Sequence, residues 1–249
     1  MTPAFAVLVF AAFAAGAQNA LAGGGTFLTF PALLYAGLDP RAANITSAVA
    51  LFPGQVTTGI AGLSLVSGVA GLSVKLLIVL SLIGGAVGAF LLMATPVSVF
   101  THLVPYLVLF ATAVFAWGSF LRKPSTTPGR ASLSPRAAAG MQLLIGIYGG
   151  YFGGGIGILM LAALTAVGMA VRQAGATKNM LASMMGGSSV LVFLFQMKFD
   201  WRIVISVAIA AIIGGQLGVY LLRRINETAL RVGITLIGLV LTVALFLRS

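Results

Sequence analysis

Residues 146–179, GIYGGYFGGGIGILMLAALTAVGMAVRQAGATKN, are the most informative part of the sequence, because an earlier segment has the same pattern. The earlier copy is QNALAGGGTFLTFPALLYAGLDPRAANITS, residues 18–47. Each copy has three consecutive glycines, an apolar run too short for an easy crossing of a bilayer, and then a polar cluster. The two clusters contain Arg41, Asn44, Thr46 and Ser47 in the first copy and Arg172, Thr177, Lys178 and Asn179 in the second.

Composition places the whole chain in a membrane. Of its 249 residues 60% are hydrophobic and 7% are charged, and the mean hydropathy is +1.13. The apolar runs are continuous over about twenty residues, whereas the strands of a membrane barrel alternate over about ten. The sequence therefore predicts an all-α polytopic membrane protein. Cysteine is absent, which excludes disulfides and cysteine-ligated metals.

The apolar runs divide the chain into ten predicted segments. They cover residues 4–21, 26–38, 43–65, 72–93, 103–121, 137–152, 156–169, 177–196, 202–222 and 229–247. Two of them, 26–38 and 156–169, are short and either cross the bilayer or turn back within it as re-entrant helices. Residues 122–136, RKPSTTPGRASLSPR, carry four cations and no acid, and we expect them to form a cytoplasmic linker. We therefore predict a single transmembrane domain, residues 1–249, with one repeat in 1–121 and the other in 137–249.

Three landmarks support a duplication at an offset of about 130 residues. The triple glycines align, IGGAVGAFLL (83–92) aligns with IGGQLGVYLL (213–222), and Arg41 aligns with Arg172. With five segments in each half the second half is inverted, and only four of the 14 Lys and Arg residues then lie outside. Four segments in each half would leave six outside, so the cytoplasmic excess of cations favours two inverted repeats. Such repeats are typical of transporters.

A helix broken at glycines exposes backbone N–H groups where the next half-helix starts, and the helix dipole adds roughly half a positive charge there. Inside a membrane these groups need a partner, and an oxyanion is one. Gly25 and Gly155 are predicted to open the short helices, and the Asn and Thr residues of the clusters to open the next ones as N-caps. Lys178 is predicted to supply charge to a bound anion. In the alternative interpretation the glycines only allow tight helix packing and the polar residues only cap helices.

The predicted substrate-binding residues are Gly25, Asn44, Thr46, Ser47, Gly155, Thr177, Lys178 and Asn179. Further candidates for lining the path are Gln18, Asn19, Arg41, Arg172 and Gln196, although Arg41 and Arg172 equally fit interfacial anchors.

Acidic residues are too few for other chemistries. Asp39, Asp200 and Glu227 are the only carboxylates and His102 is the only histidine, so the sequence predicts no metal site, no cofactor and no enzyme activity. A proton relay is poorly supported for the same reason. The net charge of +11 is spread singly or in pairs at the ends of apolar runs, which argues against a nucleic-acid partner. Export of an anion gains about 2.3 kcal/mol per charge per 100 mV, so uniport driven by the membrane potential suffices.

These motifs resemble the sulfite exporter TauE/SafE family, also called the toluene sulfonate uptake permease family. The resemblance rests on GGGTFLTFPALLYAGLDPRAANITSAVA, on YFGGGIGILMLAALTAVGMAVRQAGATKN, and on the FDW element at 199–201, which has no counterpart in the first half. It implies a secondary transporter in the cytoplasmic membrane, with small sulfur-containing or carboxylated organic anions as substrates and lipid as its surroundings. Export of sulfite, thiosulfate or organosulfonates is the leading hypothesis. A carrier of another small organic solute, a passive anion channel and an accessory subunit remain alternatives, and no oligomeric state is predicted.

Overall fold

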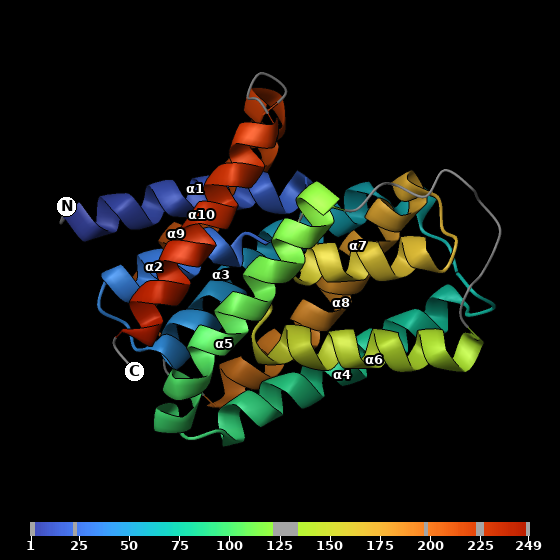
Figure 1. The fold of residues 1–249 in the computed structure, drawn as a ribbon, viewed down its shortest axis with the longest axis horizontal. Helices are drawn as coiled ribbons and strands as arrows, with labels where there is room; N and C mark the ends of the chain where they lie inside the picture. Colours follow the sequence, from blue (N-terminus) through green and yellow to red (C-terminus); the bar gives the residue numbers. More distant parts are fainter. Residues whose placement is uncertain (1–2, 22–23, 122–133, 197–198, 223–226, 248–249) are drawn as a thin grey trace.

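The computed structural model describes residues 3–21, 24–121, 134–196, 199–222 and 227–247, and in these ranges it is all-α (Figure 1). The first five α-helices are α1 (Pro3–Leu21), α2 (Thr26–Tyr35), α3 (Pro40–Ala61), α4 (Val74–Ala94) and α5 (Val97–Ala116). The second five are α6 (Pro135–Tyr151), α7 (Ile156–Ala166), α8 (Val171–Gln196), α9 (Trp201–Leu222) and α10 (Glu227–Phe246). The predicted order of ten helical segments is confirmed.

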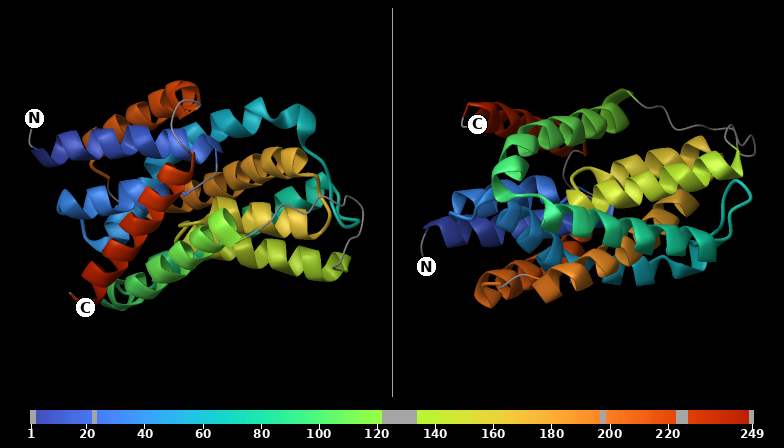
Figure 2. Two further views of the ribbon diagram at one scale, coloured as in Figure 1. Left: turned by 45° about the horizontal axis from the view of Figure 1, so that its top comes forward. Right: turned by 90° about the horizontal axis from the view of Figure 1, so that it is seen from below.

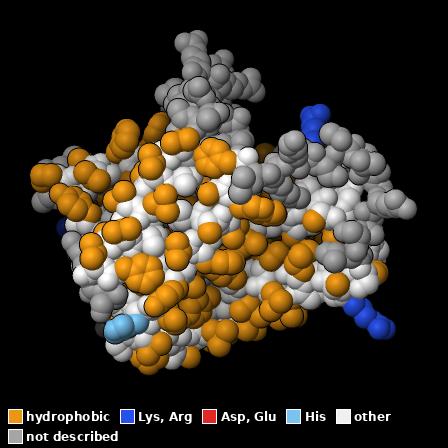
Figure 3. Space-filling view, in the orientation of Figure 1, with side chains coloured by type: hydrophobic (Ala, Val, Ile, Leu, Met, Phe, Trp, Pro, Cys, Tyr) orange, Lys and Arg blue, Asp and Glu red, His pale blue; other side chains and the backbone are white. Residues whose placement is uncertain are grey.

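The described helices suit a membrane. Three of them, α4, α5 and α8, are long and apolar enough to cross a bilayer, and α1, α2, α7, α9 and α10 contain shorter apolar segments. On the face shown in Figure 3, apolar side chains cover the described helices, and Lys and Arg side chains stand only at the rim. A soluble protein would expose charge there, so the surface confirms a polytopic membrane protein.

The two short helices end in the same backbone arrangement, as the predicted duplication would require. After α2, Gly37 has a φ of +96° and Leu38 N donates to Leu33 O. After α7, Gly168 has a φ of +93° and Met169 N donates to Leu164 O. Both ends are therefore the same left-handed glycine cap, 131 residues apart in the sequence.

The packing of the helices is reciprocal between the two sets of five. Helix α1 packs against α9 as α6 packs against α4, while α3 packs on α8 and α5 on α10 (Figures 1 and 2). Glycines lie at the corresponding contacts: Gly16 of α1 meets the backbone of Ala211 in α9, and Gly146 of α6 meets Gly84 in α4. Small residues let these backbones approach closely, as is common in membranes.

One sequence expectation was wrong. Helix α3 begins at Pro40, with the Asp39 carboxylate accepting hydrogen bonds from the backbone of Arg41 and Ala42, both at 3.0 Å. Helix α8 begins at Val171. Asn44, Thr46 and Ser47, and likewise Thr177 and Asn179, therefore lie inside helices and are not N-caps. For α3 the reason is that an aspartate followed by proline is a stronger start signal than the cluster four residues later.

Two other expectations concern the boundaries. Gly25 and Gly155 do occupy the N-cap positions of α2 and α7, as predicted. Most of the predicted linker, residues 122–133, lies outside the described residues. Its last three positions belong to the start of α6, where Ser134 Oγ accepts from Ala137 N at 3.3 Å.

Candidate functional site

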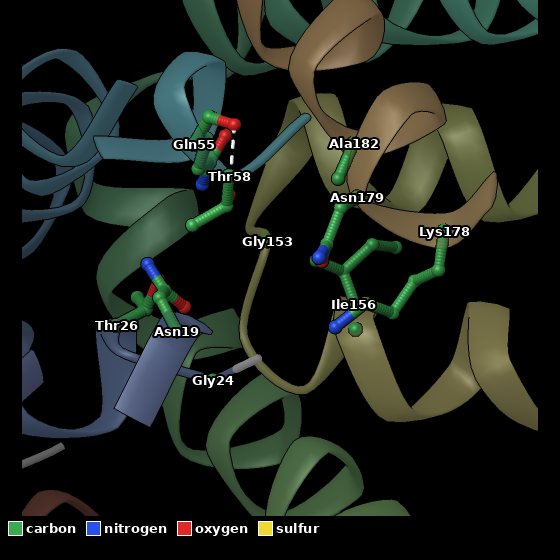
Figure 4. A pocket seen from close by; sticks show the side chains of 11 residues that line it. Asn19, Gly24, Thr26, Gln55, Thr58, Gly153, Ile156, Lys178, Asn179 and Ala182 are labelled. Atoms are coloured by element: carbon green, nitrogen blue, oxygen red, sulfur yellow. Dashed lines mark hydrogen bonds between the residues drawn. The ribbon is translucent and has the colours of Figure 1, made fainter. Parts of the chain in front are cut away.

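A small cavity lies between the two repeats, where both short helices begin (Figure 4). Its volume is about 30 Å³, and we call it the inter-repeat cavity. Its lining consists of Asn19, Gly24, Thr26, Gln55, Thr58, Gly153, Ile156, Gly157, Lys178, Asn179 and Ala182. These residues come from α1, α3 and α8, from both glycine breaks and from the first turns of α2 and α7, so both sets of five helices contribute to the wall.

The glycine breaks aim the starts of α2 and α7 at this cavity. Gly24 has a φ of +95°, and Gly153 and Gly155 have φ values of +76° and +71°. Only glycine adopts this left-handed region at little cost, which is why each break contains glycines. The first turns of both helices thus border one space.

Most of the N–H groups in these first turns have backbone partners: Phe27 N donates to Gly24 O at 2.9 Å and Ile158 N to Gly155 O at 3.1 Å. The N–H groups of Thr26 and Gly157, two lining residues, have no partner among the described residues and are available to a ligand.

A side chain from the preceding helix holds each break in place. In the first repeat, Asn19 Oδ1 of α1 accepts a hydrogen bond from Gly25 N at 2.8 Å. In the second, Tyr148 Oη of α6 donates to Gly154 O at 2.7 Å. Asn19 also lines the cavity, and because its oxygen is engaged, its amide nitrogen is the group left for another partner.

Lys178 is the one charged residue in the lining. It belongs to α8, it is 3% exposed, and no described carboxylate pairs with it. In Figure 4 its side chain runs toward Ile156 at the start of α7. An ammonium group buried without a counter-charge is costly, so this position favours a negatively charged ligand beside it.

The remaining polar lining consists of hydrogen-bonding groups without charge. Figure 4 shows Asn19 and Thr26, Gln55 and Thr58, and Asn179 reaching toward the cavity from three sides. With two helix N-termini, one lysine, amide donors and no acid, the lining matches the needs of a small oxyanion.

A second cavity adjoins the first. Its volume is about 40 Å³, and we call it the side cavity. It is lined by Thr26, Asn44, Ala48, Leu51, Gln55, Gly149, Gly150, Phe152, Gly153, Ile156, Met185, Gly186, Ser189 and Phe193.

The structure brings together only some of the predicted binding residues. Lys178 and Asn179 line the inter-repeat cavity, and Asn44 lines the side cavity. Gly25 and Gly155 shape the breaks, but neither is among the residues that line these two cavities.

Of the other three predicted binding residues, two connect elements of the protein and one is buried within a helix. Ser47 and Thr29 share a hydrogen bond of 2.5 Å between their hydroxyls, which ties α3 to α2. Thr177 Oγ1 accepts from Ser67 N at 3.2 Å and so ties α8 to the segment after α3. Thr46 is buried in α3 and lines neither cavity.

The candidates for the path are also dispersed. Asn19 lines the inter-repeat cavity, whereas Gln18, the preceding residue of α1, is buried. Arg41 donates from Nη1 to Thr95 O at 2.9 Å, and Arg172 is exposed at the start of α8. The side chain of Gln196 lies outside the described residues.

Sequence reasoning missed Thr26, Gln55 and Thr58 in the lining. Thr26 directly follows the triple glycine, and Gln55 and Thr58 follow the apolar run AVALFP, residues 48–53, within the predicted span 43–65. An amide inside a span is costly unless it has a partner, and this cost was the available signal for Gln55.

Broken helices that begin at one polar cavity between two repeats define a class of protein, the polytopic transporters. A family model described as "Sulfite exporter TauE/SafE" matches residues 8–245, and the chain belongs to this family. Relatives of the chain are also described as membrane transporters. The chain is 25% identical to a "Probable membrane transporter protein" of Haemophilus influenzae, over 95% of this chain and 92% of that one.

Two further relatives carry similar descriptions. The chain is 30% identical to the "Probable membrane transporter protein ORF9" of a Sinorhizobium species, over 86% of this chain and 81% of the relative. It is 27% identical to the "Probable membrane transporter protein YfcA" of Escherichia coli, over 98% of this chain and 90% of the relative. The protein is thus a multi-pass membrane transporter of the TauE/SafE family.

Proposed function

We propose that the protein exports a small sulfur-containing oxyanion, such as sulfite, thiosulfate or a short organosulfonate, across the cytoplasmic membrane by alternating access. The observation that carries this proposal is the position of Lys178, a buried cation that has no acidic partner among the described residues and lines a cavity where two helices begin. A bound oxyanion would satisfy the lysine and the N–H groups of Thr26 and Gly157 at once.

The size and chemistry of the cavity support a small anion over other solutes. A volume of about 30 Å³ accommodates only a few atoms, and the lining contains no carboxylate that would attract a cation. The description of the family, a sulfite exporter, points to sulfur as the central atom. Asn19, Gln55 and Asn179 would donate hydrogen bonds to the oxygens of the anion.

Alternating access further requires two halves that move against each other. The reciprocal packing of α1 on α9 and α6 on α4 supports a two-fold relation between the repeats. In Figure 1, α1 and α6 run in opposite directions, which supports the inverted arrangement that the charges favour. The inter-repeat cavity would then lie at the axis and open to either side in turn.

Export needs no second ion in this proposal. The membrane potential drives an anion out of a negative interior, with about 2.3 kcal/mol per charge per 100 mV. In proteoliposomes, anion flux should follow an imposed potential. Flux that is unchanged with the potential clamped at zero and a pH gradient in its place would contradict uniport.

The primary test is calorimetric binding to the purified protein. Sulfite, sulfate, thiosulfate, ethanesulfonate and a small amine would be titrated into the wild type, Lys178→Met and Lys75→Met, which removes an exposed lysine at the start of α4. We expect saturable binding of at least one sulfur anion, its loss in Lys178→Met and its retention in Lys75→Met, with thermal unfolding measured for each sample. No binding to the wild type, or equal binding to both variants, would refute the proposal.

A further inference from the structure

The side cavity is a natural extension of the inter-repeat cavity. Thr26, Gln55, Gly153 and Ile156 line both, so the two spaces lie on either side of a shared wall. A ligand held at Lys178 by one end would therefore direct its other end toward the side cavity.

The lining of the side cavity differs from that of its neighbour. Lys178 does not border it, and no charged side chain appears among its residues. Leu51, Phe152, Met185 and Phe193 supply apolar surface, which suits a short organic group and not a second charge.

One side-chain polar atom of this lining is fully buried and has no hydrogen-bond partner among the described residues. Asn44 is 3% exposed, and its Oδ1 is buried without a hydrogen bond. The orientation of the amide is set by the other end, because Asn44 Nδ2 donates to Tyr151 O at 3.0 Å. A flipped amide would place its oxygen against that carbonyl oxygen, so the side chain leaves an acceptor unfilled.

The hydroxyl of Ser189, another lining residue, does not fill this acceptor, because its single O–H is directed at Met185 O, 2.9 Å away, and Gly85 O, 3.0 Å away. A buried acceptor without a donor costs free energy, and a ligand with a donor at the right place would recover it. A neutral hydroxyl fits better than an ammonium, since the side cavity has no acid to offset a buried positive charge.

We infer that the substrate is a small oxyanion with a short organic substituent that ends in a neutral hydrogen-bond donor, and that Asn44 Oδ1 receives this donor. The inference rests on the proposed function, because Lys178 and the helix N-termini hold the anionic end. Asn44 is thus a residue that determines specificity among anions.

Binding of a matched series to the purified protein tests this. The ligands are sulfite, ethanesulfonate, 2-hydroxyethanesulfonate and 2-aminoethanesulfonate. One well-made hydrogen bond corresponds to about tenfold in affinity, so we expect 2-hydroxyethanesulfonate to bind about tenfold more tightly than ethanesulfonate. The amino compound should bind more weakly than the hydroxy compound.

Variants test whether Asn44 is the residue that causes the preference for the hydroxy sulfonate. In Asn44→Leu, the ratio of the affinities for the hydroxy and plain sulfonates should fall to about one. Thr112→Val, which removes a buried hydroxyl in α5 that borders neither cavity, should keep the ratio near ten. If Asn44→Leu does not fold, Ala48→Val decides, because its larger side chain enters the side cavity and should weaken the hydroxy sulfonate more than sulfite.

The proposed function and the further inference are contradicted by different results. If no ligand of the series binds the wild type, the proposed function and the inference both fall. The inference alone is overturned by any of three results: sulfite binds but the wild type does not distinguish the two sulfonates, Asn44→Leu retains the preference for the hydroxy sulfonate, or Ala48→Val weakens the hydroxy sulfonate no more than sulfite.

Discussion

Gly84 of α4 and Gly146 of α6 meet so closely that a Cβ atom on Gly84 would lie 2.8 Å from the Cα of Gly146. The corresponding contact between α1 and α9 has Gly16 against the backbone of Ala211 and Gly214 against that of Phe13. A close backbone contact at glycine thus joins the first helix of each set of five to the fourth helix of the other set. These contacts set how near the two breaks, at the ends of α1 and α6, come to each other.

A methyl group at this contact should therefore disrupt the packing of the repeats. We expect Gly84→Ala to destabilise the protein by about 1–3 kcal/mol, because the backbones must separate. Gly140→Ala is the matched control on α6, since nothing lies within 4 Å of its Cβ position. That change should leave stability equal or raise it by about 0.5–1 kcal/mol. Thermal unfolding in detergent measures both, and equal melting temperatures for the two variants would contradict the close contact.

A negative charge in the inter-repeat cavity should repel the substrate. Asn19→Asp keeps the oxygen that accepts from Gly25 N but replaces the amide nitrogen and adds a charge. We expect sulfur-anion affinity to fall about tenfold or more, with little loss of stability. Gln173→Glu makes the same chemical change at an exposed position of α8 and should leave affinity within about twofold. Binding titrations compare them, and equal affinities would place the anion elsewhere.

Much of the fold was predictable because lipid imposes simple rules on sequence. Continuous apolar runs predicted all ten helices in order, and the glycine breaks at Gly25 and Gly155 were found as helix starts. Boundaries within polar stretches were less accurate. The start of α3 at Pro40 was missed because the Asn44 cluster looked like a cap, although Asp39 supplies the cap.

The candidate site was predictable only where local sequence determines geometry. Lys178 and Asn179 follow a repeated break and were selected for that reason. Gln55 and Thr58 lie near the end of α3 and reach the cavity only because α3 packs on α8, a contact without a local signal. Ser47 and Thr177 were selected by type, but their hydroxyls bind Thr29 and the backbone of Ser67 instead.

Loss of the Tyr148 hydroxyl should loosen the second glycine break. Its hydrogen bond to Gly154 O fixes the loop that starts α7, so Tyr148→Phe should cost about 0.5–1.5 kcal/mol of stability. We also expect anion affinity to fall severalfold, because the N–H groups of α7 are then less well oriented. Tyr106→Phe, at an exposed position on α5, is the control for both measurements. An unchanged affinity in Tyr148→Phe would mean that packing alone positions the break.

Removal of the buried Thr112 hydroxyl should stabilise the protein, in contrast to removal of the Tyr148 hydroxyl. Thr112 is 2% exposed in α5, and its Oγ1 has no hydrogen-bond partner. Valine has nearly the same shape without the polar atom, so Thr112→Val should stabilise the protein by about 1 kcal/mol. Thr242→Val is the matched control, since Thr242 Oγ1 donates to Gly238 O at 2.7 Å and its loss should not stabilise. The melting temperature should rise in the first variant and stay level or fall in the second. A fall in Thr112→Val would mean that the hydroxyl contributes a favourable interaction in the folded state.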